Sequence, residues 1–129
     1  MLKILLTALS MALLPAAAFA QDAPTGITRT PLQSVDFPDG YETLLGLTEV
    51  APGAQSSPNS HPGLETGYVL EGDVTISIAG QADIVLRAGE SYTISAGTVH
   101  HVKTVGDKAA KIITTYVIER GKPLSTPAP

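Results

Sequence analysis

The sequence contains no cysteine and no tryptophan among its 129 residues. Without thiols the fold cannot contain a disulfide, and neither a cysteine nucleophile nor a thiolate metal ligand is available. Stability must therefore come from a packed apolar core, which a single domain of this length can supply. The side chains left for chemistry are histidine, carboxylate, amide and hydroxyl groups.

Basic residues are also few, with 8 Lys and Arg against 12 Asp and Glu and a formal net charge of −4. A protein that binds nucleic acid or an anionic membrane surface is expected to carry a clustered basic face. The acidic balance argues against both partners. The sequence also lacks a glycine loop of the phosphate-binding type, and any serine, histidine and acid set would have to use the same three histidines considered below.

The first twenty residues have the pattern of a secretory signal peptide. Lys3 provides a positive start, residues 4–14 form an apolar run, and Ala18-Phe19-Ala20 is a small-x-small cleavage site. The apolar run is too short to span a bilayer as a stable helix, so a retained anchor is the weaker alternative. We expect cleavage before Gln21 and a periplasmic or secreted product without membrane association. Loss of Lys3 would change the formal charge from −4 to −5.

Proline and glycine divide the rest of the chain into three parts. Residues 21–40 are rich in both and predict an extended N-terminal arm with at most an edge strand over residues 27–35. Residues 41–120 contain short apolar runs separated by turns and predict the folded domain. Residues 121–129 include three prolines and predict a flexible tail.

The folded part has the pattern of an all-β protein. The sequence from Val74 to Ile78 alternates apolar and small polar residues, as expected for a strand with one buried face. No segment after the signal peptide shows a sustained helical period. About eight short strands with frequent turns predict an antiparallel sandwich or barrel. The strand-like runs cover residues 27–35, 41–50, 66–70, 74–78, 84–87, 91–94, 100–105 and 111–119.

Only three histidines occur, and they fall in two segments about forty residues apart. His61 is followed four residues later by Glu65, and His100 and His101 are adjacent. If the two segments converge, imidazole nitrogen and carboxylate oxygen can together bind a divalent first-row metal. Considered singly, His61 could be a surface loop residue and Glu65 a solvated charge at a strand edge.

The same segments resemble the two sequence motifs of the cupin family. The first motif, G-x5-H-x-H-x3-4-E-x6-G, aligns with residues 53–72, and the second, G-x5-P-x-G-x2-H-x3-N, aligns with residues 89–104. Carried over position by position, the resemblance implies a metal site formed by Asn59, His61, Glu65 and His100.

Three positions depart from the motifs. Asn59 replaces the first histidine, Ser95 replaces the proline, and Thr104 replaces the terminal asparagine. The first departure matters most, because an amide oxygen is a weaker ligand for transition metals than imidazole. Asn59 could instead be an ordinary turn residue, a common position for asparagine beside proline.

The resemblance implies a double-stranded β-helix, the cupin jelly-roll barrel, with the metal inside. An exported cupin of this type could be a metal-dependent dioxygenase or isomerase that acts on a small organic molecule, with Fe, Mn, Ni or Zn as the metal. The alternative is a non-catalytic cupin module that binds a small ligand, because fold alone does not fix function. Whether the protein is an enzyme stays open at this stage. Cupins similar to this one pair through their sheet edges, which implies a homodimer.

Strand geometry predicts which residues near the motifs point into the barrel and which point outward. Successive side chains point to opposite faces, so His100 and His101 cannot both enter the barrel, and the motif selects His100. Gly67 lies in phase with Glu65 and either leaves room for the metal and its ligands or marks a bulge or a close strand contact. By default the tyrosines are core or barrel-lining residues, and none is assigned a catalytic role: Tyr68, Tyr92 and Tyr116.

Overall fold

A computed structural model describes residues 26–129, so the predicted signal peptide and its cleavage site lie outside the described residues. The described chain forms strands and turns without a helix, which confirms the all-β prediction. Accordingly, none of these residues belongs to a helix long and apolar enough to cross a membrane. The strands are β1 (Ile27–Val35), β2 (Tyr41–Val50), β3 (Asn59–Ser60), β4 (Gly63–Glu71), β5 (Val74–Ile78), β6 (Ile84–Leu86), β7 (Ser91–Ile94), β8 (His100–Thr104), β9 (Ala110–Glu119) and β10 (Thr126–Pro127).

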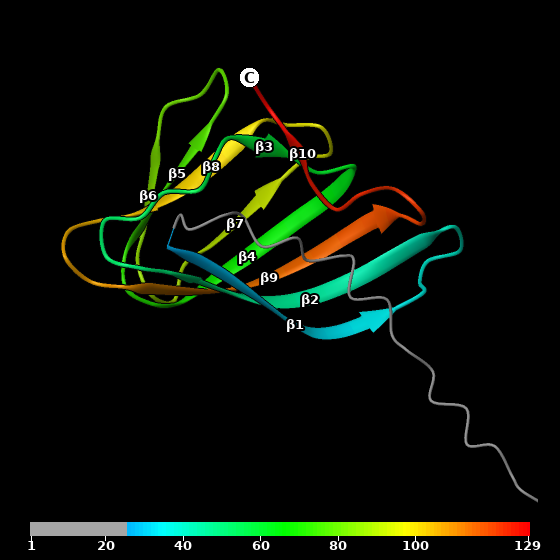
Figure 1. Cartoon of the computed structure of the whole chain (residues 1–129), viewed down its shortest axis with the longest axis horizontal. Coiled ribbons are helices and arrows are strands. Elements are labelled where there is room, and N and C mark those ends of the chain that lie inside the picture. The colour runs from blue at the N-terminus through cyan, green and yellow to red at the C-terminus, as the bar shows by residue number, and fades with distance from the viewer. Residues whose placement is uncertain (1–25) are drawn as a thin grey trace, which may run out of the picture.

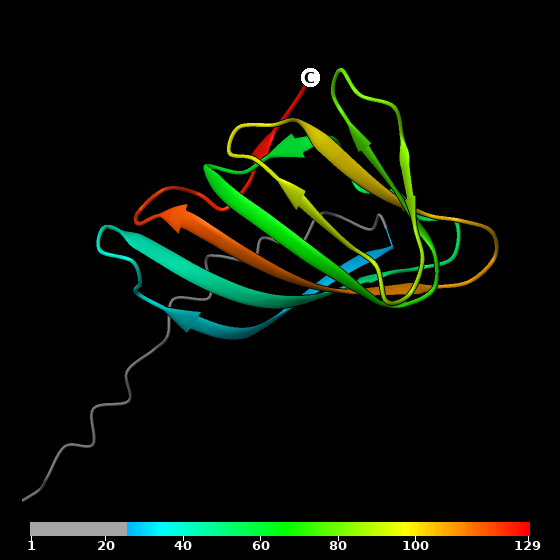
Figure 2. The same cartoon turned by 180° about the vertical axis from the view of Figure 1, so that it is seen from behind.

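The strands form two five-stranded antiparallel sheets. The first has the order β1-β2-β9-β4-β7, and the second has the order β10-β3-β8-β5-β6. The long strands β2, β4 and β9 curve along one side of the molecule, and the shorter strands of the second sheet face them (Figures 1 and 2). Consecutive strands therefore often lie in different sheets, as the crossovers in both strand orders show.

Most strand boundaries agree with the sequence prediction, because alternating runs between turn residues give a strong local signal. The predicted edge strand is β1, which pairs with β2 from Ile27 to Val35 and has no partner on its other side in the described sheet. Strands β3 and β10 are not predicted from the sequence, and each is only two residues long. Such short strands are defined by their partners and not by a periodic pattern.

The inward faces of the central strands are polar in the middle and apolar at the ends. On β9 the inward side chains begin with Ala110 and Ile112, continue with Thr114, and end with Tyr116 and Ile118. The apolar ends belong to two buried clusters. The larger contains Ile27, Val50, Val69, Val74, Ile76, Ile78, Leu86, Ile94, Ala110 and Ile112, and the smaller contains Leu44, Tyr116, Ile118 and Leu124. A polar layer thus crosses the barrel between two apolar layers.

The C-terminal segment makes contacts with the barrel that its sequence does not predict. Leu124 is 8% exposed and belongs to the smaller apolar cluster. Beyond it, β10 pairs with β3, with Thr126 opposite Ser60 and Pro127 opposite Asn59. Residues 121–129 were predicted as a flexible tail from their prolines, but apolar burial of Leu124 anchors this part of the chain on the barrel. The boundaries of the arm, barrel and tail stay a prediction.

Candidate metal centre

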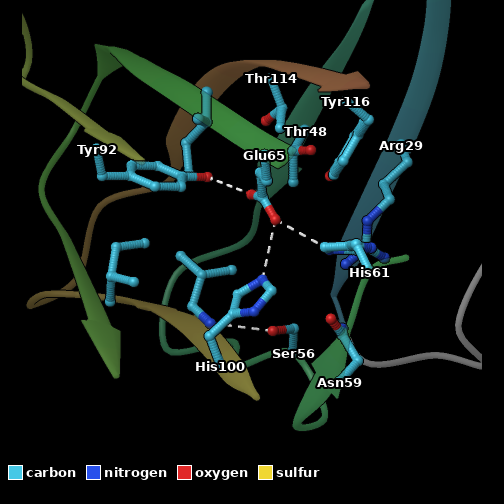
Figure 3. Close-up of a pocket in the computed structure, with 13 residues that line it drawn as sticks. Arg29, Thr48, Ser56, Asn59, His61, Glu65, Tyr92, His100, Thr114 and Tyr116 are labelled. Carbon is cyan, nitrogen blue, oxygen red and sulfur yellow. Dashed lines mark hydrogen bonds and ion pairs between the residues drawn. The ribbon is translucent and has the colours of Figure 1, made fainter. Parts of the chain in front are cut away.

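The structure brings three of the four predicted ligands to one point in the polar layer. Glu65 is on β4, His100 begins β8, and His61 lies between β3 and β4. One ligand atom from each lies within 4.8 Å of the others. All three side chains are buried, with exposures of 4%, 7% and 7% for Glu65, His100 and His61. Figure 3 shows them pointing toward one another from different segments of the chain.

Local sequence explains how His61 and Glu65 come to share this cavity. Immediately after His61 and Pro62, Gly63 begins β4 and lies opposite Ile118 of β9. A Cβ atom at Gly63 would overlap the backbone of Val117, so only glycine allows β4 to approach β9 this closely. From Gly63 onward the alternation of β4 directs Glu65 inward.

Both histidine rings are fixed by backbone carbonyl groups. His61 Nδ1 lies 2.7 Å from the carbonyl oxygen of Leu124, and His100 Nδ1 lies 2.9 Å from that of Thr98. A carbonyl oxygen only accepts hydrogen bonds, so Nδ1 must carry the proton in both rings. In the neutral imidazole this leaves Nε2 with a free lone pair, and that is the form in which histidine binds a metal.

The two Nε2 atoms converge on one carboxylate oxygen. Glu65 Oε2 lies 2.9 Å from His61 Nε2 and 3.0 Å from His100 Nε2. Oε2 is buried and accepts no hydrogen bond when both rings are neutral, because three acceptor atoms then face one another. Such a cluster requires a cation at its centre, either protons on the imidazoles or a metal ion. The residues present therefore fit a divalent metal with nitrogen and oxygen ligands.

The pKa values show how the cluster is charged without a metal. Burial raises the pKa of Glu65, but hydrogen bonds and charge interactions with His100 and His61 outweigh it and lower the pKa to about 2. For His100, burial lowers the pKa, whereas the hydrogen bond and charge of Glu65 raise it, and the net direction is upward from 6.5. The metal-free centre thus holds an ionised Glu65 next to a His100 that gains a proton readily.

Tyr92 holds the other oxygen of the carboxylate. Its hydroxyl group donates a 2.8 Å hydrogen bond to Glu65 Oε1 (Figure 3). Burial, followed by the charge of Glu65, raises the pKa of Tyr92 well above 10.0, so the phenol remains a donor. With Oε1 bound to Tyr92, Oε2 is left to face the two histidines.

Gly67 makes the position of Tyr92 possible. It lies directly opposite Tyr92 in the β4–β7 pair, and a Cβ atom at Gly67 would overlap the tyrosine ring. Of the two interpretations of Gly67 from sequence, the close contact with another strand is the one observed. The contact of Tyr92 with Glu65 is not predicted from the sequence, because it depends on the register between β4 and β7.

Asn59, the fourth predicted ligand, also lies at the cavity. It is 8% exposed, and its Nδ2 group donates a 3.3 Å hydrogen bond to the carbonyl oxygen of Ser57. Its Oδ1 atom is buried and has no hydrogen-bond partner. Leaving an amide oxygen buried without a partner costs about 1–3 kcal/mol, so Oδ1 is available to a ligand in the cavity. Its role as a fourth metal ligand stays a prediction.

His101 lies outside this group. Within residues 26–129, the set of His, Asp and Glu side chains close enough to hold one metal ion consists of His61, Glu65 and His100. His101 is partly exposed and lies opposite Ser77 of β5. The next inward residue of β8 is Val102, which packs against the larger apolar cluster. The alternation of β8 therefore separates the two adjacent histidines, as expected from the sequence.

The remaining walls of the cavity combine hydroxyl groups, apolar side chains and one cation. The cavity has a volume of about 20 Å³ and opens to solvent. That volume has room for about one water molecule or ion. The ring of Tyr116 lies 4.8 Å from that of His61. Lining residues beyond those described above are Arg29, Thr48, Ser56, Ile76, Val102, Ile112, Thr114 and Tyr116.

The contact between Leu124 and His61 gives a first prediction. Deleting residues 123–129 removes the carbonyl oxygen that orients His61, and we expect metal affinity to fall by about 10- to 100-fold, as for other groups that orient metal ligands. The matched control deletes only residues 127–129 and keeps Leu124. Metal titration should separate the two variants, with a melting curve to show that both are folded. Equal dissociation constants would show that the Leu124 carbonyl does not position His61.

Comparison with known proteins agrees with the fold and with the motifs. The family model described as a cupin domain matches residues 46–116. A germin-like protein, subfamily T member 2 of Arabidopsis thaliana, is 35% identical over 101 residues, which cover 72% of this chain and 46% of that protein. Oxalate oxidase GF-2.8 of Triticum aestivum is 31% identical over 104 residues, with 72% and 46% coverage. The chain spans about half the length of the curated relatives it matches.

Solved structures give the same result. An oxalate oxidase in complex with the substrate analogue glycolate aligns with a TM-score of 0.65 and 26% identity, covering 81% of this chain and 56% of that one. A cupin-like protein from Thermotoga maritima aligns with a TM-score of 0.68 and 20% identity, covering 79% and 75%. At that identity the second match shows the fold alone. Since the family model matches more than half of its residues, the chain belongs to the cupin family.

Proposed function

We propose that this cupin binds one divalent metal ion through His61, Glu65 and His100 and uses it to oxidise a small organic molecule. The observation that supports the proposal is the convergence of two imidazole Nε2 atoms on Glu65 Oε2 within a buried cavity. Two histidines and one carboxylate form the donor set of mononuclear non-haem iron sites, and they also suit Mn, Ni or Zn. Asn59 Oδ1 would supply a weak fourth ligand.

The bound metal would supply Lewis-acid or redox chemistry at open coordination positions. The protein's own residues would do the rest. Tyr92 keeps Glu65 oriented through Oε1, and the Leu124 carbonyl does the same for His61. The apolar layers on either side keep bulk water from the ligands, which strengthens electrostatic interactions at the site. Burial, followed by the charge of Glu65, raises the pKa of Tyr116, so its hydroxyl group stays protonated beside the cavity.

Both the similar sequences and the aligned solved structures support oxidation over isomerisation. Several of the matched proteins are named oxalate oxidases, and one aligned oxalate oxidase structure contains glycolate. The alternative function, a non-catalytic module that binds a small ligand, is favoured by Asn59, which replaces a histidine of the family motif. The metal-loaded protein should consume oxygen in the presence of oxalate. Saturable binding of oxalate without oxygen consumption would favour the module.

Metal binding should depend on pH in a defined direction. Metal and proton compete for His100, whose pKa is raised from 6.5. The metal must therefore displace a proton at and below pH 6.5, and affinity should rise by up to about tenfold per pH unit for each proton released until His100 is neutral. Titration of the metal-free protein with Mn, Fe, Ni and Zn between pH 5.5 and 8.5 measures this. Affinity that does not change with pH would exclude histidine ligation.

Several expectations about cellular context stay proposals. Export to the periplasm or outside the cell rests on the signal-peptide pattern of the first twenty residues. A small-molecule partner fits the glycolate-bound relative. A homodimer through sheet edges rests on the family resemblance and on β1, which has one edge without a partner strand among the described residues.

A further inference from the structure

Arg29 is a charged residue at the cavity that neither the motifs nor the metal site accounts for. It lies on β1 opposite Thr48 of β2 and lines the same cavity as His61, Glu65 and His100. It follows the alternation set by the buried Ile27, so its side chain points inward, where it is partly buried. Figure 3 shows the guanidinium group directed into the cavity beside Tyr116 and His61.

The charge of Arg29 acts across the cavity. Burial and the charge of Glu65 raise the pKa of Tyr116, and the charge of Arg29 and a hydrogen bond with it act in the opposite direction. On the other side of the cavity, Arg29 also opposes protonation of His100. Among the residues that line the cavity, it is the one with a permanent positive charge.

A bound metal ion would be a second cation in the same cavity as Arg29. Glu65 carries one negative charge, which a divalent ion exceeds, and Arg29 adds a further positive charge nearby. Placing like charges together is unfavourable, and an anionic ligand that contacts the guanidinium would reduce the excess positive charge. The guanidinium also has the planar fork of donors that matches a carboxylate in a bidentate arrangement.

We propose that Arg29 is the specificity residue for the substrate and binds the carboxylate group of a small organic acid. The cavity has room for about one water molecule or ion, so the acid is expected to be small and to lie mostly at the solvent-open side of the cavity. The inference rests on the proposed function, because it assigns a substrate class to the same site. It also explains why β1, an edge strand in the segment predicted as an arm, carries an arginine on its inward face.

Calorimetric titration with glycolate and with its neutral isostere glycolamide tests the proposal. For Arg29→Gln in the metal-loaded full chain, glycolate affinity should fall about tenfold or more, the range for a charge-assisted hydrogen bond, whereas glycolamide affinity should not change. Arg87→Gln is the control, since Arg87 is exposed outside the cavity. Metal affinity of Arg29→Gln should be equal to or tighter than wild type, which a merely structural loss would not produce.

Failure of this inference can be told apart from failure of the metal proposal. Equal glycolate affinity in wild type and Arg29→Gln would overturn the role of Arg29 and leave metal binding intact. If the wild type binds no metal, the same comparison in the metal-free protein still decides the role of Arg29. If Arg29→Gln does not fold, Arg29→Lys keeps the charge but loses the fork, and it should weaken glycolate binding severalfold. Wild-type affinity in Arg29→Lys would then contradict bidentate binding.

Discussion

Replacing Glu65 by glutamine is expected to lower the affinity for divalent metal by about 100-fold or more. Glutamine keeps the shape of the side chain but removes the negative charge, and a neutral amide oxygen is a weak ligand for these metals. Its amide nitrogen can also donate to the imidazole Nε2 atoms that would otherwise bind the ion. Oε2 lies 2.9 Å and 3.0 Å from those two atoms, so the substitution changes the atom on which both imidazoles converge.

The control for this variant is Glu71→Gln on the same strand. Glu71 is exposed, so its replacement should leave metal affinity within about twofold of wild type, as expected for a surface substitution. Metal titration of both variants with Mn and Zn makes the comparison. If Glu65→Gln binds metal as tightly as Glu71→Gln, the carboxylate is not a ligand, and the proposed centre must be withdrawn.

The same variant has a second expected result in the metal-free protein. Glu65 has a pKa of about 2 in the fold against an ordinary value of 4.5. Its ionised form therefore stabilises the fold above pH 4.5, and this contribution is lost as the pH falls from 4.5 to about 2. Glu65→Gln lacks this titrating group and should lose less stability over that range than the wild type. Thermal melting of the two proteins between pH 5 and pH 2.5 gives the comparison.

Local patterns were sufficient to predict most of the fold. The alternation of residues 74–78 and the turns around them predicted β5 with the boundaries that the structure shows. The spacing of the two motifs located His61, Glu65 and His100, because each motif fixes its residues relative to a turn and a strand start. The pairing of Asn59 with His100 then brings the two motifs side by side. Each pattern predicts the structure of one short segment, and the site forms where the two motif segments lie side by side.

The residues that support the centre could not be predicted in this way. Tyr92 reaches Glu65 only because the register places it opposite Gly67, and Arg29 reaches the cavity only because β1 pairs with β2. Leu124 contributes a backbone carbonyl, which leaves no signal in the side-chain sequence. These contacts depend on sheet order and register, which the whole fold decides. The permanent charge of Arg29 was the one available signal, and it lay in a segment predicted as an arm.

The second large effect on metal affinity is expected from replacing one of the adjacent histidines, His100 and His101. His100→Ala should lower metal affinity by about 100-fold or more, because it removes one of the two Nε2 atoms proposed to bind the metal and leaves the Thr98 carbonyl without its donor. His101→Ala should change the affinity by less than about twofold, because its side chain lies on the opposite face of β8. Each variant removes one imidazole from the same strand, so each serves as the control for the other.

Metal titration of the two alanine variants and the wild type, with melting curves in metal-free buffer, decides the assignment. Loss of affinity confined to His100→Ala is the expected result, and it would identify the inward face of β8 as the ligand face. Equal loss in both variants would mean that affinity follows strand stability and not ligation. Loss confined to His101→Ala would place the metal on the outer face, where Ser77 of β5 is its neighbour and Glu65 is out of reach.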